Sequence, residues 1–233
     1  MTILAIDTSN HVLGVSIIRE DQILGEFTSN VKKNHAIRAM PAIEKLCREC
    51  SVVPKDFTRI VVAQGPGSYT GVRMGVTIAK TLAWTLNVEL VGISSLEVVA
   101  QNAKGFSGYI IPITDARRGQ VFAGVYKMNG NKTEIIMKDQ LMMLDSLLEK
   151  LKEETVDVMF LGTDVDMHKD VILNALGNKY VEAPKTWNLP RPSELAFLGS
   201  EREPVDVHTF VPEYLRLAEA EANWLKGQKN ENR

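Results

Sequence analysis

The sequence predicts an α/β protein of two similar lobes, each with the element order βββαβαβα and the second one reduced. Short apolar runs bounded by turn-forming residues alternate with longer stretches of helical periodicity, as in sheets covered by helices. The run 109–127 also resembles the run 2–18, because each has an apolar strand ending in an aspartate, a short polar turn and a second strand. This recurrence indicates an internal repeat, although short strand patterns also recur by chance.

The first lobe is predicted over residues 1–105. Its first three strands follow one another so closely that they indicate an antiparallel meander. The expected strands lie at 2–6, 12–18, 22–28, 59–64 and 89–94, and the expected helices at 34–50, 71–86 and 95–103.

The second lobe is predicted over residues 106–233, after the boundary stretch KGFSG at 104–108. It opens with the repeated strand pair. The remaining strands are expected near 133–137 and 157–161, and the helices near 144–154, 169–176 and 192–202. A last amphipathic helix is expected at 213–226, where it can pack back on the first lobe.

The two aspartates that end the repeated strands, Asp7 and Asp115, are candidate phosphate-site residues. An aspartate at the mouth of a hairpin can hold a metal-bound phosphate, and two such hairpins facing each other can clamp a nucleotide between lobes. This plan is typical of the superfamily of actin, sugar kinases and heat-shock ATPases. The alternative for Asp7 is a structural cap at a strand end.

A glycine-rich loop, GPGSYTG at 65–71, lies between an expected strand and a helix. It matches neither G-x-G-x-x-G nor the P-loop, which are the two common nucleotide fingerprints. A helix N-terminus still attracts anions, which makes Gly67 and Ser68 candidates for a phosphate site. Ser68 or Thr70 can instead cap the helix itself.

Two helices carry more apolar surface than one sheet needs. The apolar positions concerned are Ala36, Ala39, Met40, Ile43 and Leu46 in the first helix and Met74, Ile78 and Leu82 in the second. They either pack on each other or form the face that binds a protein partner, because apolar faces of this kind are typical of interfaces.

The composition excludes several classes of protein. The chain has 233 residues and a net charge of −2, so it lacks the strong positive charge of proteins that bind nucleic acid alone, and we expect any such contact to be shared with a partner. No apolar run approaches the ~20 residues of a membrane span. The two cysteines, Cys47 and Cys50, exclude a disulfide framework, which favours a cytoplasmic protein, and they follow a helical pattern as structural thiols.

Several motifs together resemble the TsaB (YeaZ) family of bacterial tRNA threonylcarbamoyladenosine biosynthesis. They are ILAIDTS at the start, GPGSYTGVRMGVTIAKTLA at 65–83, ISSLE at 93–97, DARRGQVFAG at 115–124 and PEYLR at 212–216. The motifs occur in order from residue 3 to residue 216, so the resemblance covers nearly the whole chain.

The resemblance implies an actin-like ATPase (ribonuclease H-like) fold with two similar lobes. It also implies a non-catalytic subunit that forms a heterodimer with the related metalloenzyme TsaD through the helices 34–50 and 71–86. It further implies that the ATPase TsaE docks on this heterodimer and that tRNA is contacted only through the complex. A homodimer through the same face is plausible when the partner is absent.

The residues also predict no metal site, no cofactor and no catalytic residue. TsaD-like enzymes carry an H-x-x-x-H motif, and Ser95 and Val99 stand at the equivalent positions here. The turn Asp7-Thr8-Ser9 lacks the glycine with which related kinases approach phosphate. The alternatives are a small-molecule phosphotransferase of the same fold and, with less support, a metallopeptidase of the glycoprotease type.

Overall fold

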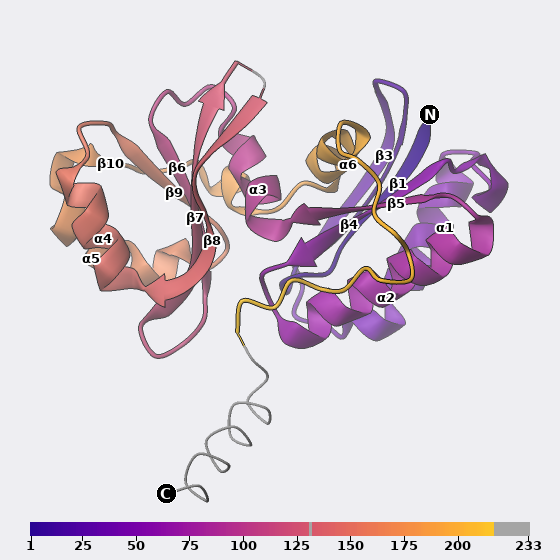
Figure 1. Ribbon diagram of the computed structural model, residues 1–233, viewed down its shortest axis with the longest axis horizontal. Helices are drawn as coiled ribbons and strands as arrows, with labels where there is room; N and C mark the ends of the chain where they lie inside the picture. The colour runs from indigo at the N-terminus through magenta and orange to yellow at the C-terminus, as the bar shows by residue number, and fades with distance from the viewer. Residues whose placement is uncertain (131, 217–233) are drawn as a thin grey trace, which may run out of the picture.

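The computed structural model describes residues 1–130 and 132–216, which form two lobes side by side (Figure 1). The first lobe holds a five-stranded sheet of order β3-β2-β1-β4-β5. Its strands are β1 (Thr2–Asp7), β2 (Leu13–Arg19), β3 (Gln22–Ser29), β4 (Arg59–Gly65) and β5 (Glu89–Ser94). The predicted antiparallel meander is confirmed, because β1 pairs antiparallel with β2 and β2 with β3.

The second lobe repeats this topology. Its sheet has the order β10-β9-β6-β7-β8, which read backwards matches the first sheet strand for strand. The strands are β6 (Tyr109–Asp115), β7 (Gln120–Asn129), β8 (Lys132–Met143), β9 (Val158–Leu161) and β10 (Tyr180–Val181). The expected two-lobed fold is therefore confirmed, and the reduction of the second lobe falls on the short strands β9 and β10.

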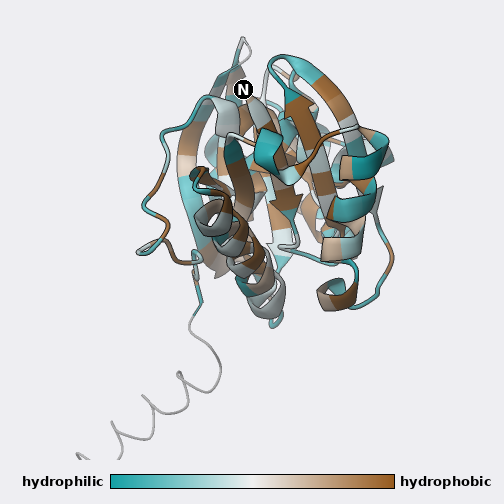
Figure 2. Cartoon of the chain, turned by 90° about the vertical axis from the view of Figure 1, so that its right-hand side faces the viewer, coloured by the Kyte–Doolittle hydropathy of each residue, from teal (hydrophilic) through white to brown (hydrophobic). Residues whose placement is uncertain are grey.

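One face of each sheet is covered by two helices of its own lobe (Figure 1). These are α1 (Ala39–Glu49) and α2 (Tyr69–Leu86) on the first sheet, and α4 (Leu144–Glu153) and α5 (Val165–Leu176) on the second. The central strands are buried on both faces, which explains their continuous apolar runs. Figure 2 views the first lobe from outside, where hydrophobic and hydrophilic positions alternate along the helices.

The other face of each sheet is covered by a helix from the opposite half of the chain. Helix α3 (Ser95–Ala100) follows the first sheet but packs Leu96, Val99 and Ala100 against the second. Helix α6 (Pro192–Ser200) follows the second sheet but packs Leu195 and Ala196 against the first. The two halves of the chain thus exchange helices across the lobe boundary.

After α6 the chain forms a strap, residues 201–216, which runs along α2 toward the second lobe (Figure 1). The ammonium group of Lys80 on α2 donates hydrogen bonds to the carbonyl oxygens of His208 and Phe210, at 3.2 and 2.6 Å. The expected helix at 213–226 does not begin at 213, because residues 213–216 are irregular, and its remaining residues lie outside the described part of the chain.

The expected helix at 34–50 is also corrected. Residues His35–Ile37 form a 3₁₀ turn capped by Asn34, and α1 begins only at Ala39. The physical reason is Pro41, which has no N–H group and is tolerated only in the first turn of an α-helix. Helix α2 instead begins two residues before the expected position 71, because Ser68 is its N-cap.

Candidate functional site between the lobes

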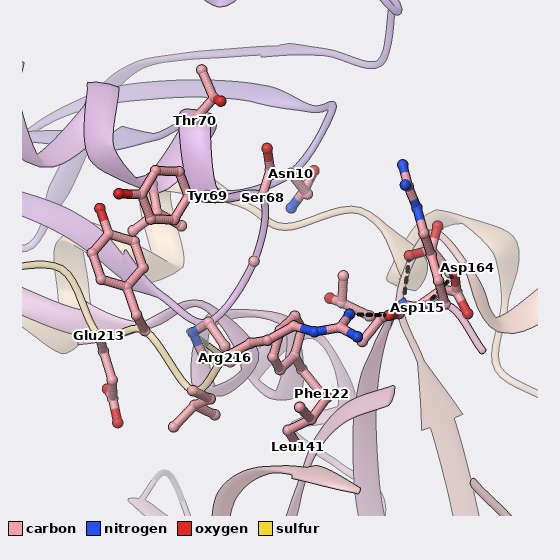
Figure 3. A pocket seen from close by; sticks show the side chains of 18 of the residues that line it. Asn10, Ser68, Tyr69, Thr70, Asp115, Phe122, Leu141, Asp164, Glu213 and Arg216 are labelled. Carbon is pink, nitrogen blue, oxygen red and sulfur yellow. Dashed lines mark hydrogen bonds between the residues drawn. The ribbon is translucent and has the colours of Figure 1, made fainter. Parts of the chain in front are cut away.

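A cleft of about 1070 Å³ opens between the two lobes (Figure 3). Three segments line most of it: the loop that leads into α2, the turn between β6 and β7, and the end of the strap. They contribute Gly67, Ser68, Tyr69 and Thr70, then Asp115, Ala116, Arg117 and Arg118, and finally residues 213–216. Of the four candidate phosphate-site residues, Gly67, Ser68 and Asp115 line this cleft and Asp7 does not.

Asp7 is completely buried. Its Oδ1 accepts hydrogen bonds from the backbone N–H and the hydroxyl of Ser9, at 2.8 and 2.7 Å, while its Oδ2 has no partner among the described residues. Burial raises the pKa of this carboxyl, and the Ser9 hydrogen bonds and the nearby His35 oppose that rise. Asp7 thus lies below the surface of the cleft and does not line it.

The turn after Asp7 is closed by a row of glycines at the start of α2. A Cβ on Gly67 would lie 2.2 Å from the Ser9 carbonyl oxygen, and one on Gly71 would lie 2.2 Å from the Thr8 carbonyl oxygen. The Thr8 hydroxyl donates to the Gly71 carbonyl at 2.7 Å, and the Ser68 N–H donates to the Ser9 carbonyl at 2.7 Å. The glycines thus let the helix lie directly on the turn.

Ser68 also acts as the predicted cap. Its hydroxyl accepts a hydrogen bond from the N–H of Gly71 at 3.3 Å, which satisfies one of the free donors at the start of α2. Of the two uses considered for this serine, the self-capped helix is the one that the structure contains.

The second hairpin turn lies open to the cleft. Asp115 Oδ1 lies 3.2 Å from the Nε2 of His168, and its Oδ2 accepts from the N–H of Arg117 at 3.1 Å. The N–H of Asp115 in turn donates to Asp164 Oδ2 at 2.9 Å. Asp115 is therefore held by the start of α5, and its carboxylate faces a polar network and not a closed turn.

The tip of this second turn has an unusual backbone. Arg117, Arg118 and Gly119 have φ angles of 64°, 57° and 72° in succession. Residues with a Cβ rarely adopt this left-handed conformation, so the two arginines carry a conformational cost that glycine or asparagine would avoid. Both arginine side chains are exposed.

The strap fastens both lobes at the cleft (Figure 3). Glu213 donates its N–H to the Gln64 carbonyl at 2.8 Å, and the ring of Tyr214 stacks on that of Tyr69 with centroids 4.6 Å apart. Arg216 then reaches the second lobe, where its guanidinium donates to the Ala116 carbonyl at 2.6 Å. PEYLR and DARRGQ, for which the sequence suggested no role, thus contact each other although 100 residues separate Ala116 from Arg216.

The comparisons with known proteins agree on one family. The family model described as TsaD, tRNA N6-adenosine threonylcarbamoyltransferase, matches residues 22–224. The chain is 53% identical over 229 residues to the Bacillus subtilis tRNA threonylcarbamoyladenosine biosynthesis protein TsaB, covering 98% of this chain and 100% of that protein. The chain belongs to the TsaB family.

Solved structures support the fold. YeaZ from Pseudomonas aeruginosa is similar with a TM-score of 0.76 and 22% identity, covering 92% of this chain and 99% of that one. A ROK hexokinase from Thermus thermophilus is similar with a TM-score of 0.50 and 12% identity, covering 86% of this chain and 100% of that one. These likenesses place the TsaB-family chain in the actin-like ATPase fold.

Ser95 and Val99, which are expected from the sequence at the positions of the H-x-x-x-H motif, are buried on α3. The hydroxyl of Ser95 accepts from the N–H of Gly65 at 3.2 Å, and Val99 packs in the core between α3 and the second sheet. Among the described residues, no three His, Cys, Asp or Glu side chains are grouped so that they could hold a metal ion. No helix in the described part of the chain is long and apolar enough to cross a membrane.

The residues predicted to form a partner face come from the 3₁₀ turn His35–Ile37, α1 and α2, and two of them are buried. Ala39 and Ile43 are 0% and 5% exposed, because this side of α1 packs on the first sheet. Met40 and Ala36 are exposed, and Ile37, which the sequence places beside them, is 72% exposed. Leu46, Met74, Ile78 and Leu82 are half-buried.

The two cysteines lie half-buried at the end of α1. Burial raises the pKa of the Cys47 thiol, and the neighbouring Cys50 raises it further. Burial likewise raises the pKa of Cys50. A raised pKa keeps a thiol protonated and unreactive, in keeping with the structural thiols predicted from the sequence.

Proposed function

We propose that this protein takes part in the biosynthesis of threonylcarbamoyladenosine in tRNA as a non-catalytic subunit. In this proposal it stabilises and activates a TsaD-like transferase by forming a heterodimer with it. A TsaE-like ATPase joins the assembly, and tRNA is contacted through the complex as a whole. The proposal rests first on the B. subtilis relative, whose similarity extends over its full length.

The closed turn at Asp7 supports a non-catalytic role. Enzymes of the actin-like fold keep this turn open for nucleotide phosphates, as the sequence motif Asp-x-Gly-Thr/Ser implies. Here the carbonyl groups of Thr8 and Ser9 lie against the glycine face of α2, and the Asp7 carboxyl has no surface exposed to the cleft.

Two exposed apolar residues, Met40 on α1 and Ile37 in the 3₁₀ turn before it, support the partner face. Met40 is 46% exposed and Ile37 is 72% exposed, and the half-buried Met74, Ile78 and Leu82 lie on the neighbouring helix α2. Large apolar side chains that stay exposed on adjacent helices are typical of surfaces that a second helical pair covers. The face is therefore assigned to Ile37 and Met40, with the half-buried residues of α2 beside them.

The proposal is tested by nucleoside mass spectrometry of tRNA from cells depleted of the protein and complemented with variants. We expect depletion to abolish threonylcarbamoyladenosine and the wild-type chain to restore it. Met40→Asp should fail to restore it and should fail to co-elute with the transferase, because a carboxylate in an apolar interface stays unpaired.

Met167→Asp is the matched control, because Met167 is a methionine of 69% exposure on α5 in the other lobe. It should restore the modification fully. An unchanged nucleoside level after depletion would refute the pathway, and co-elution of Met40→Asp with the transferase would refute the assigned face.

A further inference from the structure

We propose that the mouth of the inter-lobe cleft is a contact site for an RNA strand, formed by Arg117 of the arginine turn (residues 117–118) and the stacked pair Tyr69–Tyr214. The inference rests on the proposed function, because it takes the RNA to be the tRNA that the assembly modifies. It goes further by assigning to this subunit a direct share in holding the nucleic acid.

The arginine turn provides the first argument. An exposed turn whose residues need left-handed backbone angles is ordinarily built from glycine, asparagine or aspartate. Arg117 and Arg118 occupy two such positions in succession. Both side chains are exposed, so the burial of their apolar atoms does little to offset the strain of the backbone. Backbone strain of this kind is concentrated at functional sites, where the side chain is needed for another reason.

The Arg117 side chain is not paired with the carboxylates of the cleft. Their recorded hydrogen bonds go to other groups: Asp115 bonds with His168 and the Arg117 backbone N–H, Asp164 with the Asp115 N–H, and Glu213 with Gln64. Within residues 1–130 and 132–216 the Arg117 guanidinium makes no hydrogen bond or ion pair. A phosphate matches the planar, multiply donating guanidinium group in geometry and charge.

The tyrosine pair provides the second argument. Tyr69 and Tyr214 line the same cleft as Arg117, and they remain 44% and 39% exposed although they stack on each other. Arg216 links the two features, since it lies two residues after Tyr214 and bonds the carbonyl of the residue before Arg117. A groove that combines cations with exposed aromatic rings is typical of surfaces that bind single-stranded nucleic acid.

A strand of RNA fits this site better than a free nucleotide. Residues 7–9 of the first turn are buried against α2, whereas Arg117 and the two tyrosine rings line the cleft between the lobes. A polymer can place a phosphate on Arg117 and a base on the tyrosines from different nucleotides. With a net charge of −2, the chain supplies only a local contact, in accord with binding that is shared with the partner.

The test uses the assembled complex with an unmodified tRNA transcript and measures the dissociation constant over a series of salt concentrations. Arg117→Gly removes the guanidinium and relieves the left-handed strain. We expect weaker binding by about three-fold to ten-fold and a salt-dependence slope smaller by about 1, as for the loss of one phosphate contact. The same variant should melt at an equal or higher temperature, so the loss of binding cannot come from unfolding.

Two further variants sharpen the result. Arg117→Lys keeps the charge and the strain, and it should retain most of the affinity and the full slope. Lys150→Ala removes an exposed cation on α4, away from the cleft, and should bind as the wild type. Unchanged affinity and slope for Arg117→Gly would overturn the inference.

Binding of free mononucleotide at the cleft that tRNA does not displace would overturn it in favour of a nucleotide site. If the proposed function itself is wrong, the outcome differs from unchanged tRNA affinity of Arg117→Gly and from binding of a mononucleotide. In that case the modified nucleoside persists after depletion, and no complex of this chain with the transferase forms for the tRNA measurement.

Discussion

The two hairpin turns of the repeat occupy equivalent positions in their lobes but differ in environment. The turn at Asp7 is buried beneath α2, whose glycines let the helix lie against the carbonyl groups of Thr8 and Ser9. The turn at Asp115 lies open to the cleft and carries two arginines in left-handed conformation. The two turns thus differ in depth: Asp7, Thr8 and Ser9 of the first turn are buried and only Asn10 and His11 reach the cleft, whereas Arg117 and Arg118 of the second turn are exposed.

The largest effect is expected from forcing the first turn open. In Gly71→Ala the new Cβ would lie 2.2 Å from the Thr8 carbonyl oxygen, so α2 has to shift away from the turn. We expect a loss of about 3 kcal/mol in the free energy of unfolding, at the upper end for overpacking, measured by urea denaturation. Gly105→Ala is the control, since a Cβ there meets nothing within 4 Å, and an equal urea midpoint for the two variants would contradict this account.

A smaller effect is expected from releasing the second turn. Arg216→Ala removes the hydrogen bond to the Ala116 carbonyl that joins the strap to the second lobe. We expect a loss of about 1–2 kcal/mol and faster amide hydrogen exchange around residues 115–120. Arg48→Ala is the control, because it breaks the surface ion pair with Glu44, in which the Arg48 side chain is 74% exposed. It should change the free energy of unfolding by no more than about 0.5 kcal/mol. Unchanged exchange at the turn would show that the strap does not hold it.

The smallest effect concerns the charge at the first turn. Burial raises the pKa of Asp7 in the folded protein, so the unfolded chain loses this proton first as the pH rises. The folded state therefore loses stability as the pH rises from about 4, the pKa of Asp7 in the unfolded chain, to its pKa in the folded protein. Asp7→Asn removes this charge and keeps an oxygen for Ser9. We expect a gain on the order of 1 kcal/mol at pH 7 that disappears below about pH 4, measured by thermal melting at both pH values.

Asp206→Asn provides the opposite case for that measurement. The Thr209 N–H and hydroxyl lower the pKa of the exposed Asp206 carboxyl, so its charge favours the folded chain at neutral pH. This variant should lose a little stability at pH 7 and behave as the wild type in acid. A gain for Asp7→Asn that persisted unchanged in acid would point to packing and not to charge.

The sequence predicts those parts of the fold that leave a regular pattern of apolar residues. Continuous apolar runs identify the central strands because both of their faces are buried, and the recurrence after Asp7 and Asp115 indicates the repeat. Periodicity does not tell which edge of an apolar stripe faces the sheet. Ala39 and Ile43 therefore seemed equivalent to Met40, although the helix turns the first two inward.

The candidate site was harder to predict, because its parts meet through contacts between distant segments. Arg216 and Ala116 are joined by a hydrogen bond across 100 residues, and neither PEYLR nor DARRGQ has a periodic pattern. In the sequence, only the following Gly119 indicates the positive φ angles of Arg117 and Arg118. A glycine predicts a turn at this place but not the type of turn. The sequence did contain one indication of the buried turn at Asp7, because the glycine of the Asp-x-Gly motif is absent there.

The exchange of α3 and α6 between the lobes has a consequence for cotranslational folding. The first sheet is synthesised by residue 94, but the helix that covers its second face spans Pro192–Ser200. At about 5–20 residues per second, the roughly 100 intervening residues take about 5–20 s to appear. During that interval Ile3, Ala5 and Val61 lack the cover of α6, so the nascent chain presents an apolar sheet to chaperones until nearly the whole protein has emerged.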